Sequence, residues 1–118
     1  MRFLLRKSWF VLPFLILSMH PVPAPAADYI CTPVHVAVFK GRLHVRCNAA
    51  AKDGTASIWF WAVPTSDAHH ANRFLSVTSS ALIAGRKIRF SYTNGDTSGQ
   101  AFGCLAKDCR VPWMTAIQ

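Results

Sequence analysis

The first 26 residues constrain the chain most, because their pattern decides how much of the chain is left to fold and in which compartment. A start with three basic residues leads into an apolar run over residues 9–19, and residues 24–26 have the A-x-A spacing that a signal peptidase cuts. The run is interrupted by Pro13 and is about half of the roughly 20 residues that a membrane-spanning helix needs. An uncleaved membrane anchor is therefore the weaker alternative. We expect a cleaved signal peptide over residues 1–26 and one domain over residues 27–118, secreted or periplasmic.

All four cysteines, Cys31, Cys47, Cys104 and Cys109, lie in the part that would remain. An even number in a short exported chain indicates two disulfides, for which three pairings exist. We favour Cys31 with Cys47 and Cys104 with Cys109, because each bond closes a loop that the chain can make locally. The chain-entropy model assigns these bonds about 3 and about 2 kcal/mol. A zinc site is the alternative, but export disfavours the free thiolates that it needs.

The net charge of +8 shrinks when the signal is removed. Three of the thirteen lysines and arginines leave with it, so ten remain against five aspartates and no glutamate, a net charge of +5. Such a domain is attracted to anionic surfaces, although solubility alone also explains the charge.

Alternating residues predict a β-hairpin with a two-residue turn at Lys40-Gly41. The apolar pairs across this turn are then Val38 with Leu43, Val36 with Val45 and Val34 with Cys47. Because both apolar sets share one side, the hairpin has one face for a core and one polar face.

The rest of the chain predicts shorter elements around this hairpin. Residues 27–33 are expected to be a short arm and residues 48–54 a polar connection. Residues 56–63 predict a strand that is apolar on both sides and ends at Pro64. After Pro64, residues 65–67 (Thr-Ser-Asp) supply N-cap candidates, and Asp67 would put a negative charge in the first turn. Apolar residues recur at helical spacing from Ala71 to Leu82, and Gly85 is placed to cap the end.

The last third predicts two more strands. Ile88, Phe90 and Tyr92 alternate with polar residues, and residues 94–99 are rich in turn formers. Residues 101–117 contain a final strand, with Pro112 marking an edge or a break. The order βββαββ predicts a mainly β, α+β domain with one helix, built as a small five-stranded OB-like barrel. The alternative is an open antiparallel sheet with the helix packed on one face.

The inventory of reactive side chains does not favour an enzyme. Catalysis by acid, base or nucleophile needs paired groups, whereas this chain has scattered aspartates and no unpaired cysteine. Ser66 and Asp67 with His69 and His70 resemble triad residue types, but neighbouring positions on one helical turn point in different directions. Helix capping explains Ser66 and Asp67. We expect no catalytic residues and no cofactor.

The polar face of the hairpin carries the best candidate binding residues: Arg42, His44 and Arg46, with His35 and Phe39 beside them. His35 and His44 would be diagonal neighbours that could share a metal ion, but the arginines repel a cation, so no metal site is predicted. Trp59 or Trp61 adds a stacking surface if one ring escapes burial; otherwise the tryptophans fill the core or an oligomer contact. Export without a stronger basic cluster favours a glycan or a protein ligand over nucleic acid.

From Cys47 onward the chain resembles a known family of secreted proteins. The resemblance rests on an Ile-Trp strand, a helix rich in Phe, Leu, Ser and Ala, residues 85–90 (Gly-Arg-Lys-Ile-Arg-Phe), residues 98–104 and the close Cys104/Cys109 pair. These features resemble the B subunits of the subtilase-cytotoxin and pertussis-like bacterial toxins, which implies an OB-fold, a pentameric ring and binding of host glycans. The hairpin differs from that family in its arginines and histidines. The chain also resembles small uncharacterised exported proteins of Gram-negative bacteria, for which no activity is implied.

The sequence therefore predicts an exported, non-enzymatic binding module for an acidic glycan or a protein partner. Arg42, His44, Arg46 and Trp59 are the predicted ligand-binding residues. The alternative is a structural or homo-oligomeric envelope protein of unknown ligand.

Overall fold

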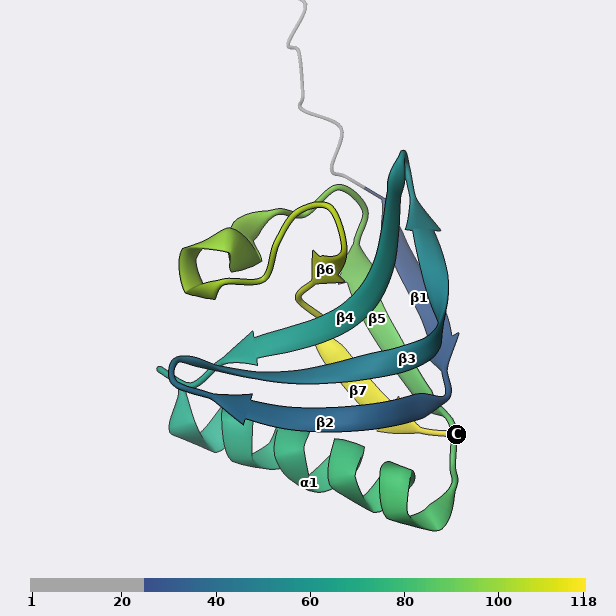
Figure 1. The fold of residues 1–118 in the computed structure, drawn as a ribbon, viewed down its shortest axis with the longest axis vertical. Helices are drawn as coiled ribbons and strands as arrows, with labels where there is room; N and C mark the ends of the chain where they lie inside the picture. Colours follow the sequence, from purple (N-terminus) through teal and green to yellow (C-terminus); the bar gives the residue numbers. More distant parts are fainter. Residues whose placement is uncertain (1–24) are drawn as a thin grey trace, which may run out of the picture.

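The structure, a computed structural model, describes residues 25–118, in which strands predominate and one α-helix lies along one side of them (Figure 1). The elements are β1 (Ala26–Cys31), β2 (Pro33–Phe39), β3 (Arg42–Asp53), β4 (Ala56–Pro64), α1 (Ala68–Ala84), β5 (Ile88–Thr93), the 3-10 helix η1 (Ser98–Phe102), β6 (Cys109–Arg110) and β7 (Met114–Ile117). The predicted export signal, except for its last two residues, lies outside the described residues.

The strands form two sheets, so the prediction of a mixed α+β fold with one helix is confirmed. One sheet has the order β1-β5-β7 and the other β2-β3-β4-β6, in which only the β4–β6 pair is parallel. From β2 onward, and apart from the two-residue β6, the elements follow the predicted order βββαββ. Within residues 25–118 the sheets do not close into a barrel. Helix α1 packs against β2 of one sheet and β7 of the other.

The first departure from the sequence prediction is β1, which was expected to be a short arm. It pairs antiparallel with β5, placing Tyr29 opposite Phe90 and Cys31 opposite Ile88. Alternate residues of β1 point into the core, where Cys31 is fully buried. The signal was the alternation of Ala27, Tyr29 and Cys31, because period-two burial is typical of a strand.

The predicted hairpin is confirmed in its register near the turn. Val38 lies opposite Leu43 and Val36 opposite Val45, on either side of Lys40-Gly41. The predicted pairing of Val34 with Cys47 is wrong, because Pro33 occupies that position and the register shifts before His35. Val34 is the extra residue of this bulge and is 50% exposed. The bulge follows Pro33, which has no N–H to donate to a ladder.

Strand β3 is longer than predicted, so the expected polar connection over residues 48–54 is wrong. After an irregularity, Ala51 pairs with Ile58 and Asp53 with Ala56, and the turn comes only at Gly54. Asn48 and Lys52 are exposed in this extension. A two-stranded ladder is built by backbone hydrogen bonds, so polar side chains facing water do not end it.

Trp61 is the centre of the main core. Its indole is fully buried and stacks on Phe90, with ring centroids 4.9 Å apart. Tyr92 meets it edge-on at 4.8 Å and Tyr29 stacks at 5.8 Å. These contacts join β4 of one sheet to β1 and β5 of the other, so one aromatic cluster holds the two sheets together.

Helix α1 agrees with the sequence prediction at both ends. The Asp67 side chain accepts a hydrogen bond from the His70 N–H at 3.1 Å, and Gly85 ends the helix with φ 64°. A left-handed φ favours glycine because other residues meet a steric penalty there. Ala71, Phe74, Thr78 and Ala81 are buried beneath the helix, as the apolar spacing predicted.

Both predicted disulfides are present. Cys31–Cys47 joins β1 to β3 and thus one sheet to the other, and Cys104–Cys109 closes the loop before β6. Two disulfides indicate an oxidising, extracellular or periplasmic environment. Pro112 lies between β6 and β7, at the break that it was expected to mark. In the described part of the chain, no helix has the length and apolar character needed to cross a membrane.

Candidate functional site

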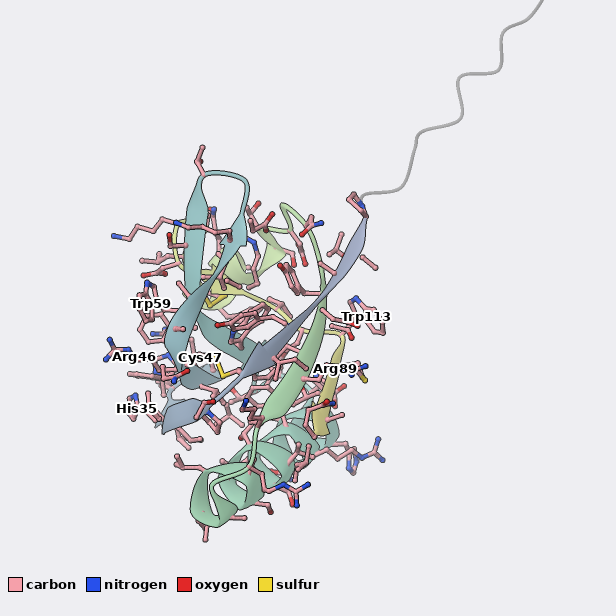
Figure 2. The ribbon with its side chains drawn as sticks, turned by 90° about the vertical axis from the view of Figure 1, so that its right-hand side faces the viewer. His35, Arg46, Cys47, Trp59, Arg89 and Trp113 are labelled. Carbon is pink, nitrogen blue, oxygen red and sulfur yellow. A yellow bond between two sulfur atoms is a disulfide. The ribbon has the colours of Figure 1, made fainter. Side chains whose placement is uncertain are left out.

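The three predicted residues of β3 lie on the outer face of the four-stranded sheet. Arg42, His44 and Arg46 alternate with residues that are buried in the core. Cross-strand pairing brings further side chains to them, because paired residues share a face. We define the basic face as His35 and Phe39 of β2, Arg42, His44 and Arg46 of β3, and Phe60 of β4. Figure 2 shows His35, Arg46 and Trp59 on one side of the molecule and Trp113 and Arg89 on the opposite side.

Arg42 is held by a ring and a glycine. Its guanidinium carbon lies 4.3 Å from the centroid of the Phe39 ring. A Cβ placed on Gly103 would come within 2.5 Å of the Arg42 Nη1 atom, so the guanidinium rests directly on that glycine. Gly103 also has φ +89°, a conformation that favours glycine. The absence of a side chain at residue 103 therefore makes the space that Arg42 occupies.

Arg46 has an aromatic neighbour as well. Its guanidinium carbon lies 5.7 Å from the Trp59 ring centroid, within the range of a cation–π contact. Neither Arg42 nor Arg46 forms an ion pair with a carboxylate within residues 25–118. Their N–H donors thus face aromatic rings and solvent rather than a fixed acid.

His44 is more enclosed than the solvated strand face that the sequence suggested. It is only 9% exposed, and its ring lies among Phe39, Phe60 and His35 at centroid distances of 4.7, 4.9 and 5.6 Å. Burial lowers the pKa of His44, the charges of Arg42 and His35 lower it further, and Asp108 opposes them. The imidazole is therefore neutral at neutral pH.

Beside this face, a pocket of about 180 Å³ opens between β3, β4 and the loop at residues 103–109. It is lined by Arg42, His44, Phe60, Gly103, Leu105, Asp108 and Cys109. The Asp108 carbonyl accepts hydrogen bonds from the Trp59 and Phe60 N–H groups at 2.9 and 3.0 Å, and the Cys104–Cys109 disulfide closes the same loop. The loop that forms this wall is thus attached to β4 through the Asp108 carbonyl, and a disulfide joins its two ends.

The two tryptophans of β4 have different environments. Trp61 is fully buried in the core, whereas Trp59 is half-buried beside Arg46. Trp59 does not line the pocket. Of the two rings, Trp59 alone retains a surface for contact with another molecule.

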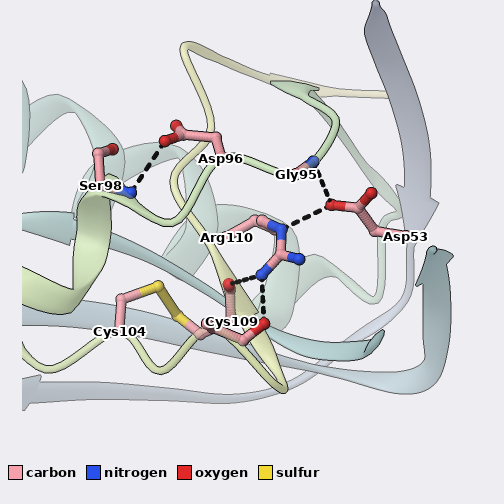
Figure 3. Close-up of polar contacts among 8 residues, drawn as sticks. Asp53, Gly95, Asp96, Ser98, Cys104, Cys109 and Arg110 are labelled. Atoms are coloured by element: carbon pink, nitrogen blue, oxygen red, sulfur yellow. Dashed lines mark hydrogen bonds and ion pairs between the residues drawn. A yellow bond between two sulfur atoms is a disulfide. The ribbon is translucent and has the colours of Figure 1, made fainter. Parts of the chain in front are cut away.

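Sequence analysis missed a buried ion pair between Asp53 and Arg110 (Figure 3). The Arg110 Nε donates to Asp53 Oδ2 at 2.6 Å, and the two side chains are 4% and 7% exposed. Arg110 Nη1 donates to the carbonyls of Ala106 and Cys109, and Asp53 accepts from the Gly95 N–H at 2.8 Å. The sequence places Asp53 only in the predicted polar connection over residues 48–54, and no local pattern joins it to Arg110.

The pKa of Asp53 results from opposing effects. Burial raises it, but the hydrogen bond from Gly95 and the hydrogen bond and charge of Arg110 together outweigh burial, so the pKa lies below its ordinary value of 3.8. Asp53 is therefore ionised near neutral pH, and Arg110 is its counter-charge.

The triad-like residues at the start of α1 do not converge. Asp67 caps the helix through the His70 backbone N–H, and His69 and His70 are exposed on successive positions of the helix. Within residues 25–118, no three histidine, cysteine or acidic side chains gather as a metal site would require.

Comparisons with known proteins identify no relative. Scans against protein-family models, curated proteins and solved structures each find no significant match to this chain.

Proposed function

We propose that this protein is an exported, non-enzymatic binding module that holds an acidic glycan on the basic face and in the adjoining pocket. The observation that carries the proposal is the pair of arginines, Arg42 and Arg46, which are supported by aromatic rings but have no carboxylate partner in the described part of the chain. A guanidinium offers five N–H donors in a planar fork that matches a carboxylate. These donors are available for an anionic ligand.

The surroundings of the arginines favour a sugar over a bare anion. Phe60 lines the pocket and Phe39 and Trp59 lie beside the arginines, so aromatic faces are available to the apolar face of a sugar ring. The charged start and apolar run of residues 1–26 support export, which would bring the protein to acidic glycans outside the cytoplasm. The order β2, β3, β4, α1, β5, β7 supports kinship with OB-folds, the fold of the toxin B subunits that the sequence resembles.

An acidic-glycan array at low and high salt tests this proposal. We expect binding that weakens as salt rises, because screening reduces the attraction between a basic face and an acidic ligand. Arg42→Ala and Arg46→Ala should each weaken binding about tenfold, the loss of one charge-assisted hydrogen bond. Arg73→Ala is the matched control, since Arg73 is an exposed arginine of α1. Binding that neither salt nor the two β3 variants alter would contradict the proposal.

A homo-oligomeric envelope protein is the second candidate, favoured by a different surface. Trp113, which precedes β7, is 60% exposed, and Ile30 of β1, in the sheet that contains β7, is 42% exposed. Large exposed apolar side chains are typical of contacts between subunits. Light scattering on the purified protein would show a ring or dimer if this candidate holds, and a strict monomer would exclude it.

A further inference from the structure

The pocket beside the basic face contains two opposite charges that do not neutralise each other. Arg42 and Asp108 both line it, yet no ion pair forms between them within the 4.0 Å limit of such contacts. The other four aspartates of the chain each accept a hydrogen bond in the described part of the structure. Asp108 is the one aspartate of residues 25–118 whose carboxylate has no such partner. The pocket thus presents a free cation and a free acceptor.

The position of Asp108 is set by its backbone rather than by its side chain. Its carbonyl accepts hydrogen bonds from two consecutive N–H groups of β4, and its own N–H donates to the Leu105 carbonyl at 3.3 Å. The next residue, Cys109, is tied to Cys104. Asp108 is half-buried, lines the pocket, and acts by its charge on His44 of the same pocket, so its carboxylate lies at this wall without contributing to the attachment of the loop.

A carboxylate in this place opposes simple attraction of anions. It reduces the positive potential that Arg42 and Arg46 produce, so a site that only captured polyanions would bind them better without it. Carboxylates accept hydrogen bonds from hydroxyl groups, and a charged acceptor makes such bonds stronger. Asp108 is consistent with a ligand that carries hydroxyl donors close to its own negative charge.

We infer that Asp108 determines specificity in this pocket by accepting hydrogen bonds from the hydroxyl groups of an acidic sugar whose carboxylate is bound by Arg42. The inference rests on the proposed function and narrows its ligand to a sugar acid with free hydroxyls. Phe60 and Leu105 supply the apolar walls for the C–H face of the ring. A volume of about 180 Å³ is smaller than the roughly 300 Å³ or more of sites for drug-sized ligands, so the pocket holds one sugar residue of a longer chain.

Titration calorimetry with three probes tests the inference. Oligogalacturonic acid carries a carboxylate and free hydroxyls on each ring, and its O-acetylated form keeps the carboxylates but loses hydroxyl donors. Highly sulfated dextran sulfate supplies dense negative charge with few free hydroxyls and no carboxylate. The variants are Asp108→Ala and Asp108→Asn, with Asp67→Asn as control. Asp67→Asn makes the same charge change at a distant helix cap, where asparagine caps as well as aspartate does.

We expect opposite changes for the two kinds of ligand. Asp108→Ala should weaken oligogalacturonate binding about tenfold, with Asp108→Asn in between because its amide oxygen still accepts a hydrogen bond. Both variants should bind dextran sulfate more tightly than the wild type, because a repulsive charge is gone. O-acetylation should weaken binding to the wild type and have little further effect on Asp108→Ala. Asp67→Asn should match the wild type with all three probes.

The outcomes separate this inference from the function on which it rests. If Asp108→Ala binds oligogalacturonate as tightly as the wild type or more tightly, or if the wild type binds dextran sulfate alone, Asp108 has no such role. In either case a loss of binding in Arg42→Ala would leave the proposed function standing. If the wild type binds none of the probes, the proposed function fails and this inference fails with it. Thermal unfolding of each variant confirms that the proteins compared are folded.

Discussion

Arg110 and Arg42 carry the same guanidinium group in two regions of one molecule, and their surroundings differ completely. Arg110 is 4% exposed, paired with Asp53, and donates to two backbone carbonyls. Arg42 lies over the Phe39 ring and against Gly103, with no carboxylate partner among the described residues. We call Arg110 and Asp53 the framework region. A buried arginine such as Arg110 contributes to stability through its acceptors, because loss of these acceptors would leave its positive charge buried without compensation. Arg42, supported by a ring and a glycine, has N–H donors that no carboxylate of residues 25–118 pairs with.

One loop connects these two regions. The carbonyls of Ala106 and Cys109 accept from Arg110, whereas Leu105 and Asp108 line the pocket beside Arg42. The loop is therefore held from one side by Arg110 of the ion pair and lines the pocket on the other side. Substitutions in the framework region should mainly change the free energy of unfolding, and substitutions in the basic face should mainly change ligand affinity.

The largest effect is expected from breaking the buried pair. Asp53→Ala should lower the free energy of unfolding by about 3 kcal/mol, because Arg110 then stays buried without its counter-charge. Urea denaturation measures this loss. The double variant Asp53→Ala/Arg110→Met should lose less than the sum of the single changes, since no buried charge is left over. A loss below about 1 kcal/mol in Asp53→Ala would mean that the pair is not part of the framework.

The next effect concerns the loop that both regions share. Replacing Cys104 and Cys109 together by serine should lower the free energy of unfolding by about 2 kcal/mol, the loop-closure entropy of a short disulfide loop. Glycan binding should fall as well, because Leu105 and Asp108 lose their defined places in the pocket wall. Denaturation and calorimetry on the same preparation measure both effects. Unchanged binding in this variant would show that the loop is not part of the site.

A smaller change in stability is expected on the basic face. Arg42→Ala should lower the free energy of unfolding by less than about 1 kcal/mol, the value of one cation–π contact near the surface. The matched framework variant is Arg110→Ala, which should lose several times more. If the two variants were equally destabilised in urea, the distinction between the two arginines would be wrong.

The smallest effect is a dependence of stability on pH, which falls in different pH ranges for His44 of the basic face and Asp53 of the buried ion pair. The pKa of His44 is lower in the folded protein than its ordinary value of 6.5. Its imidazole therefore binds a proton more readily in the unfolded chain than in the folded protein. The stability that the neutral imidazole contributes is fully present above pH 6.5. It is lost as the pH falls through the pKa that His44 has in the folded protein. The lowered pKa of Asp53 acts in a different range, since its contribution is present above pH 3.8 and is lost as pH falls below that value.

Thermal unfolding between pH 7 and pH 5 tests the contribution of His44. In His44→Gln the slope of stability against pH should be flatter in this range, because glutamine does not titrate. His69→Gln, a change at an exposed histidine of α1, should keep the wild-type slope. A slope in His44→Gln that equals the wild type would refute this contribution.

Local patterns predicted the parts of the fold that depend on neighbouring residues. The turn at Lys40-Gly41, an N-cap within residues 65–67, the end of α1 at Gly85 and the two disulfides agree with the structure. Each depends on periodicity, a turn residue or a short loop, all of which are visible in one stretch of chain. Val34 was misplaced by one residue because a bulge adds a residue without changing the alternation of apolar and polar types.

The candidate site could be predicted only in part, because local patterns place only residues that are near one another in the sequence. The alternation along β3 placed Arg42, His44 and Arg46 on one face, but it did not bring Asp108 or Gly103 to them. Those residues come from a loop about 60 residues further along the chain, and two backbone hydrogen bonds to β4 position it. Distant segments meet through the pairing of strands and the packing of the core, which no local pattern records.

By itself the sequence determined the local structure of this protein: which residues alternate, where the helix begins and ends, and which cysteines can close a loop. The tertiary structure alone decided that Trp61 is core while Trp59 is half-buried, and that the strands form two sheets rather than a closed barrel. It also decided that Arg110 finds a buried acid while Arg42 does not. The reason is physical. Burial and charge compensation are properties of what surrounds a side chain, and those surroundings exist only after the chain has folded.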